Sequence, residues 1–181
     1  MAVLNEEQEM LRDMAREWTV NESPVTEFRK VRASGEPEAF NRDAYATMAQ
    51  MGWAGVIIPE EHGGSDFGFL SAGLVVEELG KTLTASPLVM NTVAASAIVL
   101  GGSDEQKARW LPRLASGEAI ATLAVDEGPS HDPAKIETSV SDGKLSGTKA
   151  FVHEAHGADL FVVAAKDCLL YTSPSPRDKS S

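Results

Sequence analysis

The stretch Trp110-Leu-Pro-Arg-Leu-Ala-Ser-Gly-Glu-Ala-Ile-Ala-Thr-Leu-Ala-Val125 decides the fold class. Before Gly117, the apolar residues Trp110, Leu111 and Leu114 recur at helical spacing. After Gly117, the stretch Ala119–Val125 is apolar except for Thr122, as in a buried strand. The change of pattern predicts an α+β protein in which helices come first and strands follow, rather than alternating βαβ units.

Upstream of Gly117 the pattern is helical throughout. It predicts five helices, which begin after Asn5, at Phe40, at Phe67, after Ser86-Pro87 and after Ser103. Asn5 with Gln8, and Ser103 with Gln106, are typical of capping boxes. The charge-free stretch from Thr82 to Ser103 is as long as a membrane span, but proline, asparagine and glycine interrupt it. We therefore expect a buried helix there and no membrane span.

Downstream of Gly117 the sequence predicts strands and turns. Asp142-Gly143 is a strong hairpin signal. The predicted strands are Ala119–Val125, Ile136–Val140, Lys144–Val152 and Leu160–Ala165. We expect a helical domain over residues 1–117 and part of a β domain over residues 118–167. Residues 168–181 are rich in Ser and Pro and lack periodicity, which predicts a disordered or non-native tail.

Composition narrows the class of protein. The chain has 27 acidic and 16 basic residues, for a formal charge of −11, which disfavours binding to nucleic acid. Cys168 is the single cysteine, so no disulfide framework is possible. The N-terminus lacks the basic and apolar regions of a secretory leader. Together these features predict a cytoplasmic protein.

Few residues suggest chemistry by themselves. No phosphate-binding loop, nucleophile elbow or dinucleotide-binding glycine pattern is present, and the four histidines have no cysteine near them, so we expect no metal site. Asp126 and Glu127 differ from the other acidic pairs because they end an apolar strand, directly before Gly128-Pro129. Polar groups at such a junction often contact a ligand.

Several motifs, in this order, resemble the acyl-CoA dehydrogenase family. They are Met51-Gly-Trp-Ala-Gly-Val-Ile-Ile-Pro-Glu-Glu-His-Gly-Gly-Ser65, Val76-Glu-Glu-Leu-Gly80, Gly102-Ser-Asp-Glu-Gln-Lys-Ala-Arg-Trp-Leu-Pro-Arg-Leu-Ala-Ser-Gly117, Leu145-Ser-Gly-Thr-Lys-Ala-Phe-Val152 and Ala158-Asp-Leu-Phe-Val-Val163. The resemblance covers residues 4–167. It implies an N-terminal helical domain, the first part of a β-barrel-like middle domain, and a C-terminal helical bundle that these 181 residues do not include.

The resemblance also implies a reaction and partners. The family uses FAD to desaturate an acyl-CoA thioester between its α and β carbons, in fatty-acid β-oxidation. Its glutamate base lies in the C-terminal bundle, so no catalytic residue is assigned here. Electron-transfer flavoprotein is the implied acceptor, and a homo- or heterotetramer is the implied assembly.

The family's flavin-binding run, Thr-Glu-Pro-x-x-Gly-Ser-Asp, corresponds to Ala124-Val-Asp-Glu-Gly-Pro-Ser-His-Asp132. A gap-free match puts Val125 on the threonine and His131 on the serine. The register we prefer is shifted by one residue and puts Asp126 on the threonine and Glu127 on the glutamate. The family's Trp-Ile-Thr becomes Phe151-Val152-His153. The implied flavin contacts are Ala124, Val125, Asp126, Glu127, His131, Phe151, Val152 and His153.

Two other interpretations stay open. One is a catalytically silent partner subunit of a heteromeric acyl-CoA dehydrogenase. The other is a flavin oxidase or monooxygenase on the same fold. The loss of hydroxyl side chains from the flavin-binding run suits the silent subunit.

Overall fold

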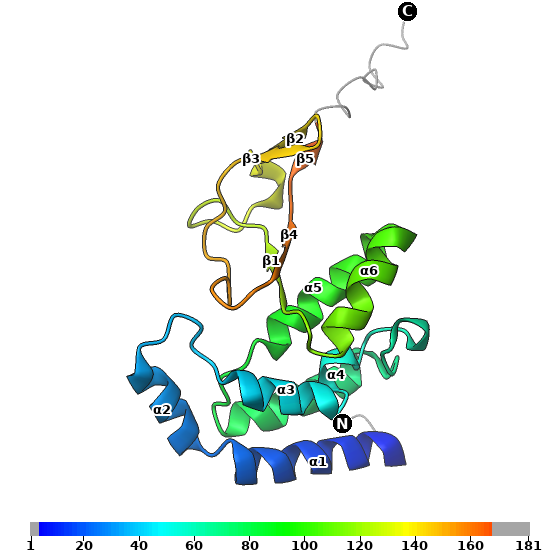
Figure 1. The fold of residues 1–181 in the computed structure, drawn as a ribbon, viewed down its shortest axis with the longest axis vertical. Coiled ribbons are helices and arrows are strands. Elements are labelled where there is room, and N and C mark those ends of the chain that lie inside the picture. Colours follow the sequence, from blue (N-terminus) through cyan, green and yellow to red (C-terminus); the bar gives the residue numbers. More distant parts are fainter. Residues whose placement is uncertain (1–3, 168–181) are drawn as a thin grey trace, which may run out of the picture. The chain divides into compact units, whose positions relative to one another are not determined.

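A computed structural model describes residues 4–167, so the predicted tail at 168–181 lies outside the described residues. Helices come first and short strands follow, as predicted (Figure 1). The helices are α1 (Glu6–Glu22), α2 (Val25–Ser34), α3 (Arg42–Gln50), α4 (Gly68–Lys81), α5 (Leu88–Gly101) and α6 (Asp104–Ala115). None of the helices in this range is long and apolar enough to cross a membrane.

The helix starts follow from local side-chain chemistry. The Asn5 side chain accepts a hydrogen bond from the Gln8 backbone N–H at 2.8 Å, and Ser103 accepts one from Gln106 at 3.3 Å. Each glutamine side chain also accepts a hydrogen bond from the backbone of its capping residue. Both predicted capping boxes are therefore confirmed, since all the donors and acceptors are present.

The prediction missed α2. Pro24 ends α1 as expected, but it also begins this second helix, which stops at Gly35 in the left-handed conformation (φ 70°). None of the α2 residues is fully buried. The helix therefore lacks the strong apolar periodicity from which the other helices were predicted.

The strands form two small sheets. β1 (Ala121–Ala124) pairs with β4 (Leu160–Val163), and β2 (Ser139–Ser141) lies between β3 (Lys144–Ser146) and β5 (Lys166–Asp167). β2 and β3 are antiparallel, with Ser141 opposite Lys144. Asp142 and Gly143 join them with positive φ angles of 51° and 70°, which confirms the predicted hairpin turn.

The predicted strand Lys144–Val152 is wrong in its second half, because β3 ends at Ser146. Gly147 follows with φ 152° and lies so close to Thr138 that a β-carbon would overlap that side chain. Residues 147–152 consequently leave the sheet as a loop. Ile136–Val140 is also shifted, since β2 begins at Ser139.

The described residues divide into two compact units. One comprises residues 4–122 and 153–162, and the other comprises residues 123–152 and 163–167. The first unit contains the apolar core. Trp53, Met48 and Leu88 are buried in one cluster, and Ile58, Leu111 and Leu114 are buried in another. Trp18 packs edge-to-face on Trp53 with ring centroids 5.5 Å apart.

A buried carboxylate joins α1 to α4. The Glu78 side chain is 1% exposed, and its Oε1 accepts hydrogen bonds from Arg16 at 3.2 Å and Lys81 at 2.8 Å. Burial by itself raises the pKa of Glu78, but the hydrogen bonds from Lys81 and Arg16 outweigh burial and place the pKa below its usual range. Glu78 therefore forms structural ion pairs with Arg16 and Lys81 in the helical unit.

Candidate functional site

β1 leads the chain from the helical unit to the predicted site. At its start, the buried Asn91 side chain accepts a hydrogen bond from the Ala121 N–H at 2.9 Å. The Asp159 carboxylate accepts a hydrogen bond from the Ile120 N–H at 2.9 Å. These buried or half-buried contacts hold the start of the strand within the helical unit, and they were not predicted from the sequence.

The segment 125–127 lies beside the segment 149–150 in the second unit. The Ala150 N–H donates to the Asp126 carbonyl oxygen at 2.7 Å. The Lys149 ammonium donates to the Val125 carbonyl oxygen at 2.9 Å. Two segments that the sequence places more than twenty residues apart are thus adjacent, and Phe151 follows directly after them.

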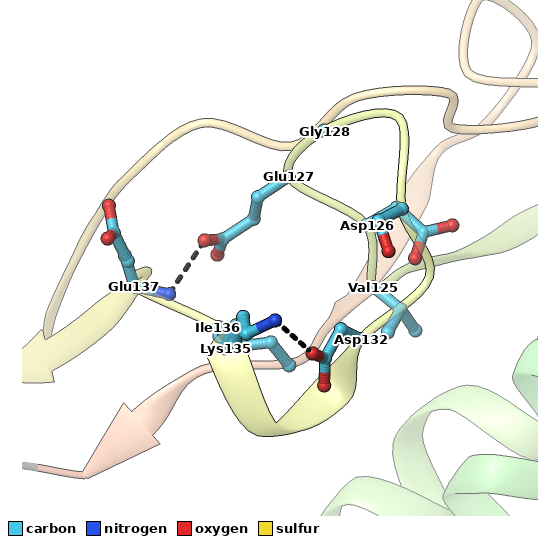
Figure 2. A pocket seen from close by; sticks show the side chains of 9 residues that line it. Val125, Asp126, Glu127, Gly128, Asp132, Lys135, Ile136 and Glu137 are labelled. Atoms are coloured by element: carbon cyan, nitrogen blue, oxygen red, sulfur yellow. Dashed lines mark hydrogen bonds and ion pairs between the residues drawn. The ribbon is translucent and has the colours of Figure 1, made fainter.

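The Glu127 carboxylate fastens this segment to a third one. It accepts hydrogen bonds from the Glu137 N–H at 2.6 Å, the Thr138 N–H at 2.9 Å and the Lys149 ammonium at 2.8 Å (Figure 2 shows the carboxylate aimed at the Glu137 nitrogen). The Lys149 ammonium, together with the hydrogen bonds from Thr138 and Glu137, holds the pKa of Glu127 well below its usual range. The Glu127 carboxylate is ionised at neutral pH, and its oxygens accept hydrogen bonds from these protein donors.

A cavity of about 240 Å³ lies inside the loop that Glu127 closes. Figure 2 shows the acidic side chains around it, and Lys135 bridges to Asp132 at 2.9 Å. The lining residues are Val125, Asp126, Glu127, Gly128, Ser130, Asp132, Lys135, Ile136 and Glu137. Within residues 4–167, no group of three or more His, Cys, Asp or Glu side chains is arranged to hold a metal ion.

Asp126 and His131 pair with each other. Their side chains meet at 2.7 Å between Oδ1 and Nδ1, with the His131 side chain 69% exposed. His131 replaces the family's serine in the gap-free match, and Asp126 replaces the threonine in the shifted match; in the structure these two side chains bind each other.

Phe151 presents an aromatic ring to solvent. It is 69% exposed and its backbone has φ 54°. A bulky residue rarely adopts this conformation, and such strain often accompanies function. Val152 is half-buried in the same unit.

His153 belongs to the helical unit, so the structure does not place it relative to Phe151's unit. Its side chain is exposed, and its carbonyl oxygen accepts a hydrogen bond from the Thr122 hydroxyl at 2.7 Å. Ala124, at the end of β1, is buried, and its carbonyl oxygen accepts a hydrogen bond from the Ala164 N–H at 3.0 Å.

Comparison with known proteins identifies the family. Residues 5–118 match the Acyl-CoA dehydrogenase, N-terminal domain, family. The chain therefore belongs to the acyl-CoA dehydrogenase family. It is 32% identical over 172 residues to acryloyl-CoA reductase (NADH) from Anaerotignum propionicum, a match that covers 90% of this chain and 42% of the relative. It is 31% identical over 171 residues to the short-chain specific acyl-CoA dehydrogenase of Clostridium acetobutylicum, covering 90% of this chain and 44% of the relative.

Solved structures agree in fold. A variant of the Tcur3481-Tcur3483 steroid ACAD matches with a TM-score of 0.82 and 30% identity, over 90% of this chain and 45% of that one. An acyl-CoA dehydrogenase complexed with FAD, from Bacillus anthracis, matches with a TM-score of 0.76 and 26% identity, over 91% and 30%. The ChsE4-ChsE5 complex from Mycobacterium tuberculosis matches at 0.80 and 25%, over 93% and 46%. The chain thus spans less than half the length of these relatives.

The second unit has groups that suit a flavin ring. The backbone N–H groups of Asp126 and Glu127 donate no hydrogen bond to another described residue, so both donors can bind a ligand. The exposed Phe151 ring is a flat apolar surface for stacking. Backbone donors and an exposed aromatic ring are the kinds of group that bind the polar edge and the face of an isoalloxazine.

Sequence reasoning missed Lys149, although it lies inside one of the motifs that carry the resemblance. The sequence signal was a lysine two residues before the aromatic residue of the predicted flavin contact. Its partners could not be predicted, because they are 22 and 24 residues away.

Proposed function

We propose that this chain forms the N-terminal part of an FAD-dependent acyl-CoA dehydrogenase that introduces a double bond between the α and β carbons of an acyl-CoA thioester. The observation that carries the proposal is the pairing of segment 125–127 with segment 149–150, because it gathers free backbone donors and Phe151 in one unit. The family membership supports the reaction class.

In this proposal the chain's residues bind and orient the cofactor. The N–H groups of Asp126 and Glu127 donate to the pyrimidine edge of the ring, where negative charge develops on reduction. Ala124 and Val125 contribute backbone only, and Phe151 and Val152 pack against the ring face. His131 contacts the cofactor from the loop that follows segment 125–127, whereas His153, which belongs to the helical unit, takes no part in this arrangement. When bound, FAD accepts the β hydrogen as hydride, while a base outside the 181 residues removes the α proton.

Flavin binding tests the proposal directly. FAD should bind the 181-residue chain, and the flavin's fluorescence and visible spectrum should change on binding. Phe151→Ala should weaken this binding about tenfold, since base–aromatic stacking of this kind contributes roughly 1–3 kcal/mol. Phe69→Ala is the matched control, because Phe69 is 67% exposed and lies on α4 in the other unit. A chain that takes up no FAD, or equal effects of the two variants, would refute the proposal.

A second candidate is the catalytically silent partner subunit of a heteromeric enzyme. The Asp126–His131 pair favours it, because these side chains satisfy each other and bring a carboxylate to the segment that would contact an electron-rich ring. Under this alternative the chain binds no FAD by itself but assembles with a flavin-binding subunit. Restoring the family's hydroxyl groups should then create FAD binding where the parent chain has none: Val125→Thr with His131→Ser tests the gap-free match, and Asp126→Thr tests the shifted one.

The proposed partners follow from the same assignment. Acyl-CoA is the substrate, electron-transfer flavoprotein is the electron acceptor, and the complete enzyme is a homo- or heterotetramer. A flavin that is reoxidised by oxygen faster than by electron-transfer flavoprotein would favour an oxidase or monooxygenase.

A further inference from the structure

Lys149 is a nearly buried cation whose partners both lie in one segment. Its side chain is 9% exposed, and its ammonium binds the Val125 carbonyl oxygen at 2.9 Å and the Glu127 carboxylate at 2.8 Å. A lysine is seldom buried to this extent unless it is paired. The ammonium therefore fixes the backbone of residues 125–127 as well as neutralising Glu127.

Peptide geometry links the Lys149 ammonium to the free donors. A trans peptide is planar, so its carbonyl and its N–H point in opposite directions. None of the peptide bonds described is cis. By binding the Val125 carbonyl, Lys149 thus directs the Asp126 N–H away from itself. The next peptide is held in the same way. The Ala150 N–H binds the Asp126 carbonyl, so the Glu127 N–H of that peptide points away from Ala150.

We infer that Lys149 is a positioning residue, which aims the Asp126 N–H at the pyrimidine edge of the flavin through the Val125–Asp126 peptide. The inference rests on the proposed function. Lys149 acts through the backbone rather than by touching the cofactor. Glu127 supports it, because its carboxylate joins the ammonium to the Glu137 and Thr138 N–H groups and keeps the loop closed.

The test uses nuclear magnetic resonance on the isotope-labelled 181-residue chain. Residual dipolar couplings give the direction of the Asp126 N–H without flavin, and an FAD titration gives the shift of the same amide. Lys149→Met keeps the apolar stem but removes the donor. We expect it to change the Asp126 coupling and to weaken FAD binding at least about tenfold.

Two variants make the comparison specific. Lys135→Met is the matched control, since Lys135 is 82% exposed, lies in the same unit and undergoes the same loss of charge. It should change neither the coupling nor the affinity. Lys149→Arg retains a charged donor, so it should keep the N–H direction and restore FAD affinity to within about threefold of the parent.

The outcomes separate the inference from the proposed function. If Lys149→Met leaves both the N–H direction and FAD affinity unchanged, the positioning role is wrong. If the parent chain shows no FAD-induced shift at Asp126, the proposed function is wrong, even where Lys149→Met rotates the peptide. If Lys149→Met fails to fold, Lys149→Arg decides, because a folded Arg variant with tenfold weaker FAD binding contradicts the inference.

Discussion

Gly63 and Gly64 are adjacent, yet the structure predicts opposite reasons for their being glycine. Gly63 has φ 81°, and a β-carbon there would meet no atom within 4 Å. A β-carbon on Gly64 would overlap the Ile58 carbonyl and lie 2.6 Å from the Gly55 carbonyl oxygen. Both of these oxygens belong to backbone that cannot rotate aside, and both already accept hydrogen bonds, from Asp66 and Ser65.

The expected cost of each substitution follows from these surroundings. Gly64→Ala should destabilise the helical unit by about 3 kcal/mol, the upper part of the usual range for overpacking. Gly63→Ala should cost about 1 kcal/mol, because the left-handed conformation costs roughly 1–2 kcal/mol and the lower entropy of the unfolded chain offsets part of it. For a domain of this size, these free energies correspond to a fall in Tm of roughly 6–12 °C and 2–4 °C.

Thermal and urea unfolding followed by circular dichroism measure both effects. Asparagine tolerates the left-handed conformation, so Gly63→Asn should unfold close to the parent temperature. Gly64→Asn should be at least as unstable as Gly64→Ala, because any side chain at residue 64 overlaps the neighbouring backbone. The reasoning would be refuted if Gly64→Ala proved no more destabilising than Gly63→Ala.

Three further predictions concern charge and packing. Removing Arg16 alone should lower the free energy of unfolding by about 1 kcal/mol or less, because its side chain is half exposed. Removing Arg16 and Lys81 together leaves the Glu78 carboxylate buried without a partner. This double variant should lose about 3–5 kcal/mol in urea unfolding. The folded-state pKa of Glu127 lies below its unfolded value of about 4.3. Its contribution to stability is therefore present above that pH and is lost progressively as pH falls towards the folded-state pKa. The protection factor of the Thr138 amide against hydrogen exchange should fall in this range in the parent but not in Glu127→Gln. Leu114→Ala empties a fully buried position and should cost about 3 kcal/mol; a calorimetric shift of under 2 °C would contradict the packing described.

The Asp126 and Glu127 pair shows how far the candidate site could be predicted. Its position after an apolar strand and before Gly128-Pro129 predicted a loop with ligand-binding polar groups, and in the structure this loop borders a cavity. The sequence did not indicate that the two side chains differ. Asp126 pairs with an exposed histidine, whereas Glu127 accepts hydrogen bonds from three protein donors. Which donors reach a carboxylate depends on segments far away in the chain.

The sequence alone determined the features that arise from neighbours in the chain. Caps three residues apart, helical periodicity and the Asp142-Gly143 turn are local, and all are present in the structure. Only the tertiary structure decided that Lys149 binds the Val125 carbonyl, that Arg16 and Glu78 meet across 62 residues, and that Phe151 lies outside any strand. Contacts of this kind depend on how the elements pack, because the residues concerned have no periodicity or spacing that relates them.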